Sequence, residues 1–178
     1  TEIYTLSLHD ALPISKSEKN LADAFAGESQ ANRKYLAFAK QADAEGYPQV
    51  ARLFRAAAEA ETVHAHAHLK ALGGIKSTKE NLQEAIGGET HEFKEMYPPM
   101  IEDAKAEGAT EALRSFTYAN TVEKTHAELY QKASDTLGQA GEQFDYYVCP
   151  VCGHTHEKAA PEKCPVCGVP ASMFVQIK

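Results

Sequence analysis

Four glutamates fall in the middle of apolar helix faces, and this placement limits what the chain can fold into. Between Ser17 and about Gly138, apolar residues recur at helical spacing and predict four helical segments. Each segment carries one such acid, in the order Glu28, Glu61, Glu89 and Glu123. Four ionised carboxylates in one core would repel each other and lose their hydration, at a cost of several kcal/mol each. A buried metal cluster would resolve this conflict.

Short turns containing Gly or Pro separate the helical segments. These turns fall at residues 45–48, at Gly73-Gly74 and at Gly108, and Ser77 with Glu80 forms a capping-box pattern that opens the third segment. Because short connections place successive helices antiparallel, residues 16–140 are predicted to form an all-α four-helix bundle.

The bundle contains an internal repeat, since its first two helical segments align with its last two. The matched residues are Glu28 with Glu89, Glu61 with Glu123, and His64 with His126. The alignment slips by one residue between the first of these pairs and the turns, so the third segment carries one extra residue. That segment also contains Pro98-Pro99, which remove helix hydrogen bonds. We therefore predict a kink or a one-turn π-bulge at residues 96–100.

The spacing of acids and histidines indicates the kind of metal. In Glu61-x-x-His64 and Glu123-x-x-His126, a carboxylate and an imidazole lie one turn apart on one helix face. A single pair of this kind is ordinarily a solvated helix face. Two pairs in repeat register, with two further core acids, match the pattern of di-iron carboxylate proteins. Oxygen-rich ligation with one imidazole per ion suits iron or manganese.

Glu92 is an acid with no counterpart in the first half of the repeat. It follows Glu89 at helical spacing, whereas Ala31 occupies the matching place after Glu28. A seventh side chain in a site that needs six ligands would let an ion exchange partners as its charge changes. The alternative is that Glu92 is a solvated surface acid.

Two histidines and two tyrosines also lie near the predicted ligands. His68 lies one turn beyond the first Glu-x-x-His and could replace its histidine, but neither His66 nor His68 has a counterpart in the second half. We expect both at the surface or behind the ligands. Tyr35 and Tyr97 lie two turns beyond the first acid of each half, and we expect them in the core, with hydroxyls able to reach the carboxylates.

All four cysteines lie in the last thirty residues, in the knuckles Cys149-Pro-Val-Cys152-Gly and Cys164-Pro-Val-Cys167-Gly. Paired knuckles of this spacing predict a tetrahedral four-thiolate metal site rather than disulfides. Zinc would make it a structural ribbon and iron a one-electron carrier, and the spacing does not choose between them. The Pro-, Gly- and Cys-rich composition predicts a small, mostly β or loop domain over residues 144–178, with short extended stretches at residues 144–148 and 173–177.

Charge and hydropathy exclude two classes of partner. Asp and Glu total 25 against 18 Lys and Arg, a formal charge of −7, so the positive surplus of a nucleic-acid binder is missing. Apolar runs fall short of the ~20 residues that cross a bilayer, so we expect no membrane partner and a soluble protein.

The first fifteen residues read as foreign to the protein. Residues 1–15 lack the basic start and apolar core of a signal peptide. Through Ile14 they match the codon-by-codon translation of a common sequencing-library adapter. We therefore expect this segment to be adapter read-through and not native sequence, which removes His9 from the candidate ligands.

A ligand-bearing bundle followed by two Cys-Pro-x-Cys-Gly knuckles resembles the rubrerythrin family. The resemblance runs from about Lys19 to the C-terminus and includes the strings AFAGESQA, GGETHEFKEMYPPM and AEG. It implies a ferritin-like bundle with a non-haem di-iron centre bridged by oxo and carboxylate groups. It also implies a rubredoxin-like domain with one iron held by the four cysteines, where zinc is possible.

The resemblance implies roles for individual residues as well. The metal ligands would be Glu61 and Glu123 as bridges, Glu28 on one iron, and Glu89 with His126 on the other. Glu92 and His64 would be alternative ligands of the first iron, in the diferric and diferrous states respectively. With Tyr35 and Tyr97, these two are the expected catalytic residues.

The activity implied by the resemblance is reduction of hydrogen peroxide to water, in defence against oxidative stress. Single electrons would arrive through the rubredoxin-like iron from rubredoxin or an NADH-dependent rubredoxin reductase. That reductase must be a separate protein, because the chain has no Gly-rich nicotinamide fingerprint. The resemblance also implies a cytoplasmic location and a head-to-tail homodimer, in which the Cys-bound iron of one subunit would lie near the di-iron site of the other and pass electrons to it. The alternative function is a ferroxidase or iron-handling ferritin-like protein with a structural zinc ribbon.

Overall fold

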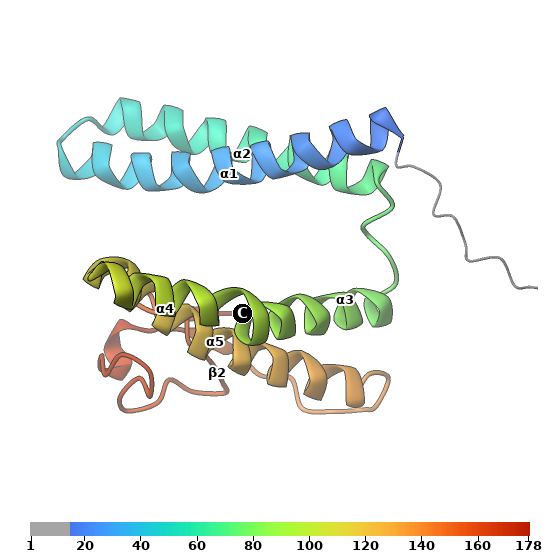
Figure 1. The fold of residues 1–178 in the computed structure, drawn as a ribbon, viewed down its shortest axis with the longest axis vertical. Helices are drawn as coiled ribbons and strands as arrows, with labels where there is room; N and C mark the ends of the chain where they lie inside the picture. Colours follow the sequence, from blue (N-terminus) through green and yellow to red (C-terminus); the bar gives the residue numbers. More distant parts are fainter. Residues whose placement is uncertain (1–14) are drawn as a thin grey trace, which may run out of the picture. The chain divides into compact units, whose positions relative to one another are not determined.

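The computed structural model describes residues 15–178, which divide between two compact units (Figure 1). One unit contains the helices α1 (Lys16–Ala44) and α2 (Pro48–Ala71). The other covers residues 77–178 and contains α3 (Thr78–His91), the π-helical turn η1 (Glu92–Met96), α4 (Tyr97–Glu107), α5 (Thr110–Asp135) and a small sheet. The adapter prediction for residues 1–15 lies outside the described residues, except at Ser15.

In the first unit, α1 and α2 form an antiparallel pair joined by a tight turn. Ser15 caps α1 through a capping box, since its hydroxyl accepts from the Glu18 N–H at 3.1 Å and its own N–H donates to the Glu18 carboxylate at 2.8 Å. Gly46 has a φ of 81°, which permits the reversal between the helices. The predicted turn at residues 45–48 is therefore confirmed.

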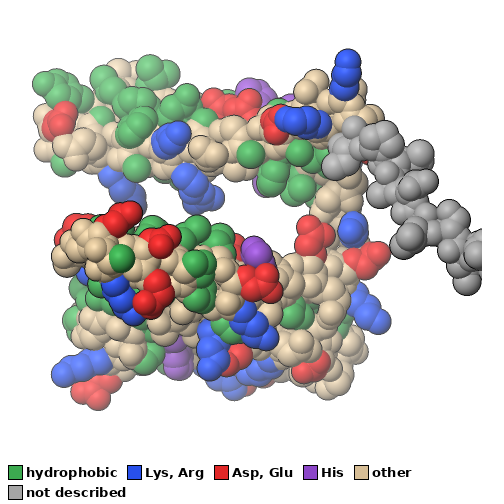
Figure 2. Space-filling view, in the orientation of Figure 1, with side chains coloured by type: hydrophobic (Ala, Val, Ile, Leu, Met, Phe, Trp, Pro, Cys, Tyr) green, Lys and Arg blue, Asp and Glu red, His purple; other side chains and the backbone are tan. Residues whose placement is uncertain are grey.

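The α1–α2 pair leaves much of its apolar surface exposed. Figure 2 shows hydrophobic side chains gathered towards the end of the pair that holds its turn. The large exposed residues there are Leu36, Phe38, Tyr47, Val50 and Leu53. A helix pair with an apolar outer face needs a further layer to cover it, as in a bundle.

The second unit begins with the predicted capping box. The Ser77 N–H donates to the Glu80 carboxylate at 3.1 Å, and the Glu80 N–H donates back to the Ser77 hydroxyl at 3.3 Å. At the far end of α4, Gly108 takes a left-handed conformation with a φ of 67°. That conformation ends the helix and allows α5 to return along α3 and α4.

A π-helical turn interrupts the third helical segment, but slightly earlier than predicted. It spans Glu92–Met96, whereas the prediction was 96–100, and the following α4 is regular from Tyr97. The Tyr97 N–H bonds to the carbonyl of Glu92, five residues back. Pro98 and Pro99 lack the N–H groups that would bond four residues back, so the irregular hydrogen bonds fall in the turn before them. The turn absorbs the extra residue of the repeat.

The C-terminal segment folds into a three-stranded antiparallel sheet of order β2-β1-β3. Its strands are β1 (Tyr146–Val148), β2 (Thr155–Glu157) and β3 (Val175–Ile177), with Tyr147 paired to His156 on one side and Gln176 on the other. The sequence predicted extended chain at the first and third positions and missed β2. Four helical segments followed by a small Cys-bearing sheet confirm the predicted fold class. Among the described residues, no helix is long and apolar enough to span a membrane.

Buried Asn32 joins the two helices of the first unit. Its side-chain amide donates to the Ala58 carbonyl at 2.6 Å and to the Thr62 hydroxyl at 2.8 Å. We predict that Asn32→Ala lowers the free energy of unfolding by about 1–3 kcal/mol, because the amide bonds are lost and a small cavity forms. Urea denaturation measures this. Thr62→Val removes only one of the two bonds and should cost less; an equal or larger cost would contradict the interpretation.

Candidate metal centres

The first predicted metal group comes from α1 and α2. Ligand atoms of Glu28, Glu61 and His64 lie within 4.8 Å of one another. Nδ1 of His64 lies 2.9 Å from Oε2 of Glu61, and the Glu61 side chain is only 18% exposed whereas the His64 side chain is 55% exposed. The helical spacing of three residues brings carboxylate and imidazole to one face. The structure thus brings together the three residues that the repeat assigned to this half.

The second group comes from α3 and α5 and matches the first. Ligand atoms of Glu89, Glu123 and His126 also lie within 4.8 Å of one another. Nδ1 of His126 is 2.8 Å from Oε2 of Glu123 and 3.8 Å from Oε1 of Glu89. Each half of the repeat therefore supplies two carboxylates and one imidazole, as the sequence predicted.

Electrostatics in the second group favour a cation. Burial, repulsion from Glu123, a hydrogen bond to that same carboxyl and repulsion from Glu92 together raise the pKa of Glu89 to about 7. Two carboxyl groups this close share a proton when no positive ion is between them. The donor set of carboxylate oxygens and one imidazole nitrogen suits iron or manganese. These residues therefore fit the predicted metal.

Glu92 and Tyr97 lie near the second group without forming part of it. Burial raises the pKa of Glu92, and the charge of Glu123 raises it further, while His91 and His126 act in the opposite direction. Burial likewise raises the pKa of Tyr97, and the charges of Glu123, Glu92 and Glu89 add to that effect. Glu92 begins the π-helical turn, so the irregular backbone lies where a spare ligand was predicted.

The remaining predicted residues of the bundle lie outside the three ligand groups found among the described residues. Tyr35 packs in an aromatic cluster, with its ring 6.4 Å from that of Phe38 and 6.1 Å from that of Phe54. His66 is exposed and His68 is partly exposed. The choice of His64 over these two histidines agrees with the geometry of the first group.

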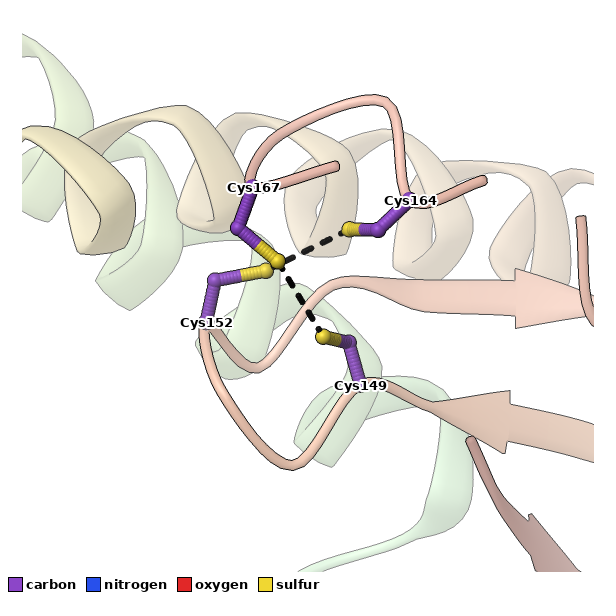
Figure 3. A group of neighbouring side chains, drawn as sticks. All are labelled: Cys149, Cys152, Cys164 and Cys167. Atoms are coloured by element: carbon purple, nitrogen blue, oxygen red, sulfur yellow. Dashed lines mark hydrogen bonds between the residues drawn. The ribbon is translucent and has the colours of Figure 1, made fainter. Parts of the chain in front are cut away.

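The four cysteines converge in the C-terminal module, from two facing knuckles (Figure 3). The Sγ atoms of Cys149 and Cys167 are 3.5 Å apart, as are those of Cys152 and Cys164. These separations exclude disulfides, and all four thiols are free. Metal–sulfur bonds of about 2.3 Å in a tetrahedron give sulfur–sulfur edges of about 3.8 Å, so the four thiols fit one metal ion.

The knuckle thiols differ in pKa, because burial and hydrogen-bond donors act on them in opposite directions. Burial acts to raise the pKa of Cys164, but N–H groups of Cys167 and Val166, together with the thiols of Cys152 and Cys167, outweigh it and the pKa falls to about 7. In Cys152, burial raises the pKa more than the His154 N–H lowers it. Positive φ angles at Gly153 and Gly168, 84° and 80°, turn the chain back after each knuckle.

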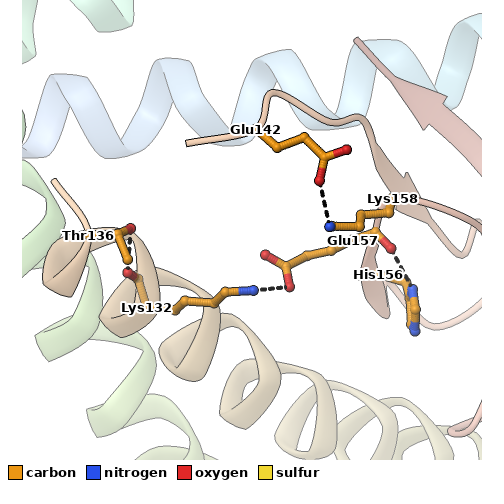
Figure 4. Close-up of polar contacts among 6 residues, drawn as sticks. All are labelled: Lys132, Thr136, Glu142, His156, Glu157 and Lys158. Carbon is orange, nitrogen blue, oxygen red and sulfur yellow. Dashed lines mark hydrogen bonds and ion pairs between the residues drawn. The ribbon is translucent and has the colours of Figure 1, made fainter. Parts of the chain in front are cut away.

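Strand β2 carries residues that the sequence analysis missed. Thr155 contacts the second metal group, with its hydroxyl Oγ1 3.0 Å from Nε2 of His126. At the end of the same strand, Glu157 forms an ion pair with Lys132 of α5, and Lys158, the residue after the strand, forms another with Glu142 (Figure 4). No periodic signal marks a three-residue strand, so only the position of Thr155 three residues beyond Cys152 could have drawn attention to it.

Two matching Glu/Glu/His groups on a four-helix domain and a four-cysteine site in a small sheet define a class of protein. It is a non-haem metalloprotein with carboxylate–histidine sites and a separate thiolate site, a combination consistent with di-iron plus rubredoxin-type iron.

Comparison with known proteins identifies the family. The rubrerythrin family model matches residues 19–134, and the model for the rubrerythrin rubredoxin-like domain matches residues 147–175. Rubrerythrin-2 of Clostridium acetobutylicum is 39% identical over 86% of this chain and 92% of its own length. Nigerythrin of Nitratidesulfovibrio vulgaris is 35% identical over 90% of this chain and 86% of its own length.

Solved structures agree with this assignment. Nigerythrin in its partially reduced state aligns with a TM-score of 0.56 at 35% identity, over 95% of this chain and 90% of that one. The fully reduced, all-ferrous state aligns with the same TM-score at 33% identity, over 99% of this chain and 94% of that one. The chain belongs to the rubrerythrin family, with a rubrerythrin domain and a C-terminal rubredoxin-like domain.

The raised pKa of Glu89 predicts a pH dependence for the metal-free protein. In the unfolded chain this carboxyl ionises near pH 4.5, and in the folded protein near pH 7. Its contribution to stability is therefore complete below about pH 4.5 and is lost as the pH rises through 7. We predict that Glu89→Gln, which keeps a donor to Glu123, changes the free energy of unfolding of the metal-free protein more favourably at pH 8 than at pH 4.5. The difference between the two pH values should be on the order of 2 kcal/mol, with solvent screening included.

Urea denaturation at both pH values, in a chelator, measures this difference. The control is Glu128→Gln, an exposed acid on α5. If both variants show the same pH dependence as the unsubstituted protein, the repulsion between Glu89 and Glu123 is too weak to matter.

Proposed function

We propose that this protein is a non-haem di-iron peroxidase that reduces hydrogen peroxide to water. The observation that carries the proposal is the presence, in one chain of the rubrerythrin family, of two equivalent Glu/Glu/His groups and a complete four-cysteine site. In this proposal the two groups would together hold a pair of iron ions, with Glu61 and Glu123 as the ligands shared by both ions. The domains responsible are residues 16–140 and 144–178.

The reaction consumes one peroxide, two electrons and two protons and yields two waters. A bound pair of ferrous ions supplies the two electrons and the Lewis acidity for this chemistry. The chain itself supplies protons and orientation. The raised pKa of Tyr97 keeps its hydroxyl protonated beside the carboxylates of Glu123, Glu92 and Glu89. This hydroxyl can therefore offer a hydrogen to a departing oxygen.

The two histidines are held differently, and this supports the proposed ligand exchange. The His64 ring is more than half exposed, and its bond to Glu61 lies within its own helix. His126 is 27% exposed, its Nε2 contacts Thr155 of another element, and its Nδ1 faces Glu123. We therefore assign the exchangeable position to His64 and Glu92, and a fixed position to His126.

The four-cysteine site would return electrons one at a time. A thiolate-bound iron suits this role, because its ligands need not change when it is oxidised or reduced. We propose rubredoxin or an NADH-dependent rubredoxin reductase as the donor. The head-to-tail homodimer and the cytoplasmic location are parts of the same proposal.

The central test is a stopped-flow visible spectrum. The iron-loaded protein is reduced anaerobically and mixed with stoichiometric hydrogen peroxide. We expect the ferric–thiolate band and the diferric band to return rapidly and together, since both sites feed one reaction. Absence of a thiolate band after iron loading would indicate a zinc ribbon, and slow reoxidation by peroxide but fast reoxidation by dioxygen would indicate a ferroxidase.

Glu92→Ala tests the exchangeable ligand. We expect it to retain both bundle irons but to lower peroxide turnover by at least tenfold, because the diferric state loses its added carboxylate. The matched control is Glu95→Ala, an exposed acid in the same π-helical turn whose carboxylate contacts His91. Iron content and steady-state peroxidase rates give the result, and an unchanged rate in Glu92→Ala would remove ligand exchange from the mechanism.

A further inference from the structure

A hydroxyl from the rubredoxin-like domain touches a metal-binding histidine of the bundle in the same compact unit. Oγ1 of Thr155, on β2, lies 3.0 Å from Nε2 of His126, on α5. The other ring nitrogen, Nδ1, faces Glu123 at 2.8 Å and Glu89 at 3.8 Å. The Nδ1 edge of the imidazole ring therefore points to the metal group, and Nε2 on the opposite edge points to the small domain.

The hydrogen-bond directions at Thr155 are fixed by its second partner. The hydroxyl lies 3.3 Å from the carbonyl of Gly153, which can only accept, so the hydroxyl proton is used there. Its oxygen is left to accept from an Nε2–H group on His126. A neutral imidazole has one N–H, so this arrangement leaves the lone pair on Nδ1, where the metal would bind.

The same chain of bonds continues to the cysteine site. The peptide group that joins Gly153 to His154 accepts from Thr155 through its carbonyl and donates to the Cys152 sulfur through its N–H. One peptide unit and one hydroxyl thus connect a thiolate ligand to an imidazole ligand. The connection lies within a single chain, whereas a head-to-tail dimer would connect sites of different subunits.

Packing alone does not hold the His126 ring in place. A mostly apolar cavity of about 310 Å³ lies beside it, lined by His126 and Thr155 together with Leu82, Leu129 and Tyr146. The ring has room on this side, so the hydrogen bond is needed to set its orientation. The two elements that carry the bond are kept together nearby by the ion pair between Lys132 and Glu157 (Figure 4).

We propose that Thr155 is a positioning residue that fixes the metal-binding tautomer of His126. The proposal deepens the proposed function, because it assigns a fixed ligand to the bundle centre. It does not depend on the reaction catalysed, since tautomer and metal affinity can be measured without peroxide.

The test uses the full chain loaded with zinc, which is diamagnetic, so that histidine protons can be observed by NMR. We expect a slowly exchanging Nε2–H signal from His126 that is lost in Thr155→Val and retained in Thr155→Ser. We also expect Thr155→Val to weaken zinc binding at the bundle by about 10–100-fold, the usual effect of removing an outer hydrogen-bond partner of a ligand. Competition with a chelator measures that affinity.

Two controls separate this role from general damage. Thr121→Val removes an exposed hydroxyl on α5 that bonds only to the Thr117 carbonyl of its own helix, and it should change neither readout. The four-cysteine site of Thr155→Val, followed by the cobalt–thiolate absorption of a cobalt-loaded sample, should be unchanged. If Thr155→Val keeps the Nε2–H signal and full affinity, or if Thr155→Ser fails to restore them, the proposal is wrong. A peroxidase rate of zero in every variant would count against the proposed function alone.

Discussion

The cost of holding like-charged carboxylates inside helix faces governs this structure. Glu61, Glu89 and Glu123 have side chains less than one-fifth exposed, and each has a second acid within reach of its own group. Without a cation, burial and the neighbouring carboxylates favour the protonated form of Glu89, whose pKa is raised to about 7. A cation held by these carboxylates would offset the repulsion. Metal binding would then be linked to the folding of the helices.

The two halves of the repeat supply the same donors but hold them differently. The extra residue in the second half is absorbed by the π-helical turn that starts at Glu92, which adds a carboxylate where the first half has Ala31. The second half also has a histidine that Thr155 of another element contacts, whereas the first has an exposed histidine, His64. In the proposed centre, the exchange would therefore take place between His64 of the first half and Glu92 of the second, while His126 keeps its position.

Much of this could be predicted from the sequence, because the signals are local. Helix periodicity, the Ser77–Glu80 capping box, the glycine turns and the Cys-x-x-Cys spacing each depend on residues close together in the chain. The π-helical turn was predicted from the repeat but placed too late, since the prolines act on carbonyls four residues before them. Strand β2 and the contact of Thr155 with His126 were missed. They depend on residues 29 positions apart, and no spacing rule applies to such a contact.

The contact between Thr155 and His126 allows the two kinds of metal site to be connected within one chain. Resemblance alone led to the expectation that electrons cross between subunits, whereas the chain itself places a peptide group and a hydroxyl between Cys152 and His126. The two arrangements depend on different contacts. Transfer between subunits depends on how a dimer assembles, but an intrachain connection depends only on α5 and β2 staying in contact, which the ion pair of Lys132 with Glu157 favours. The small domain would then act on the bundle twice, as an electron carrier and as the partner that orients a metal ligand.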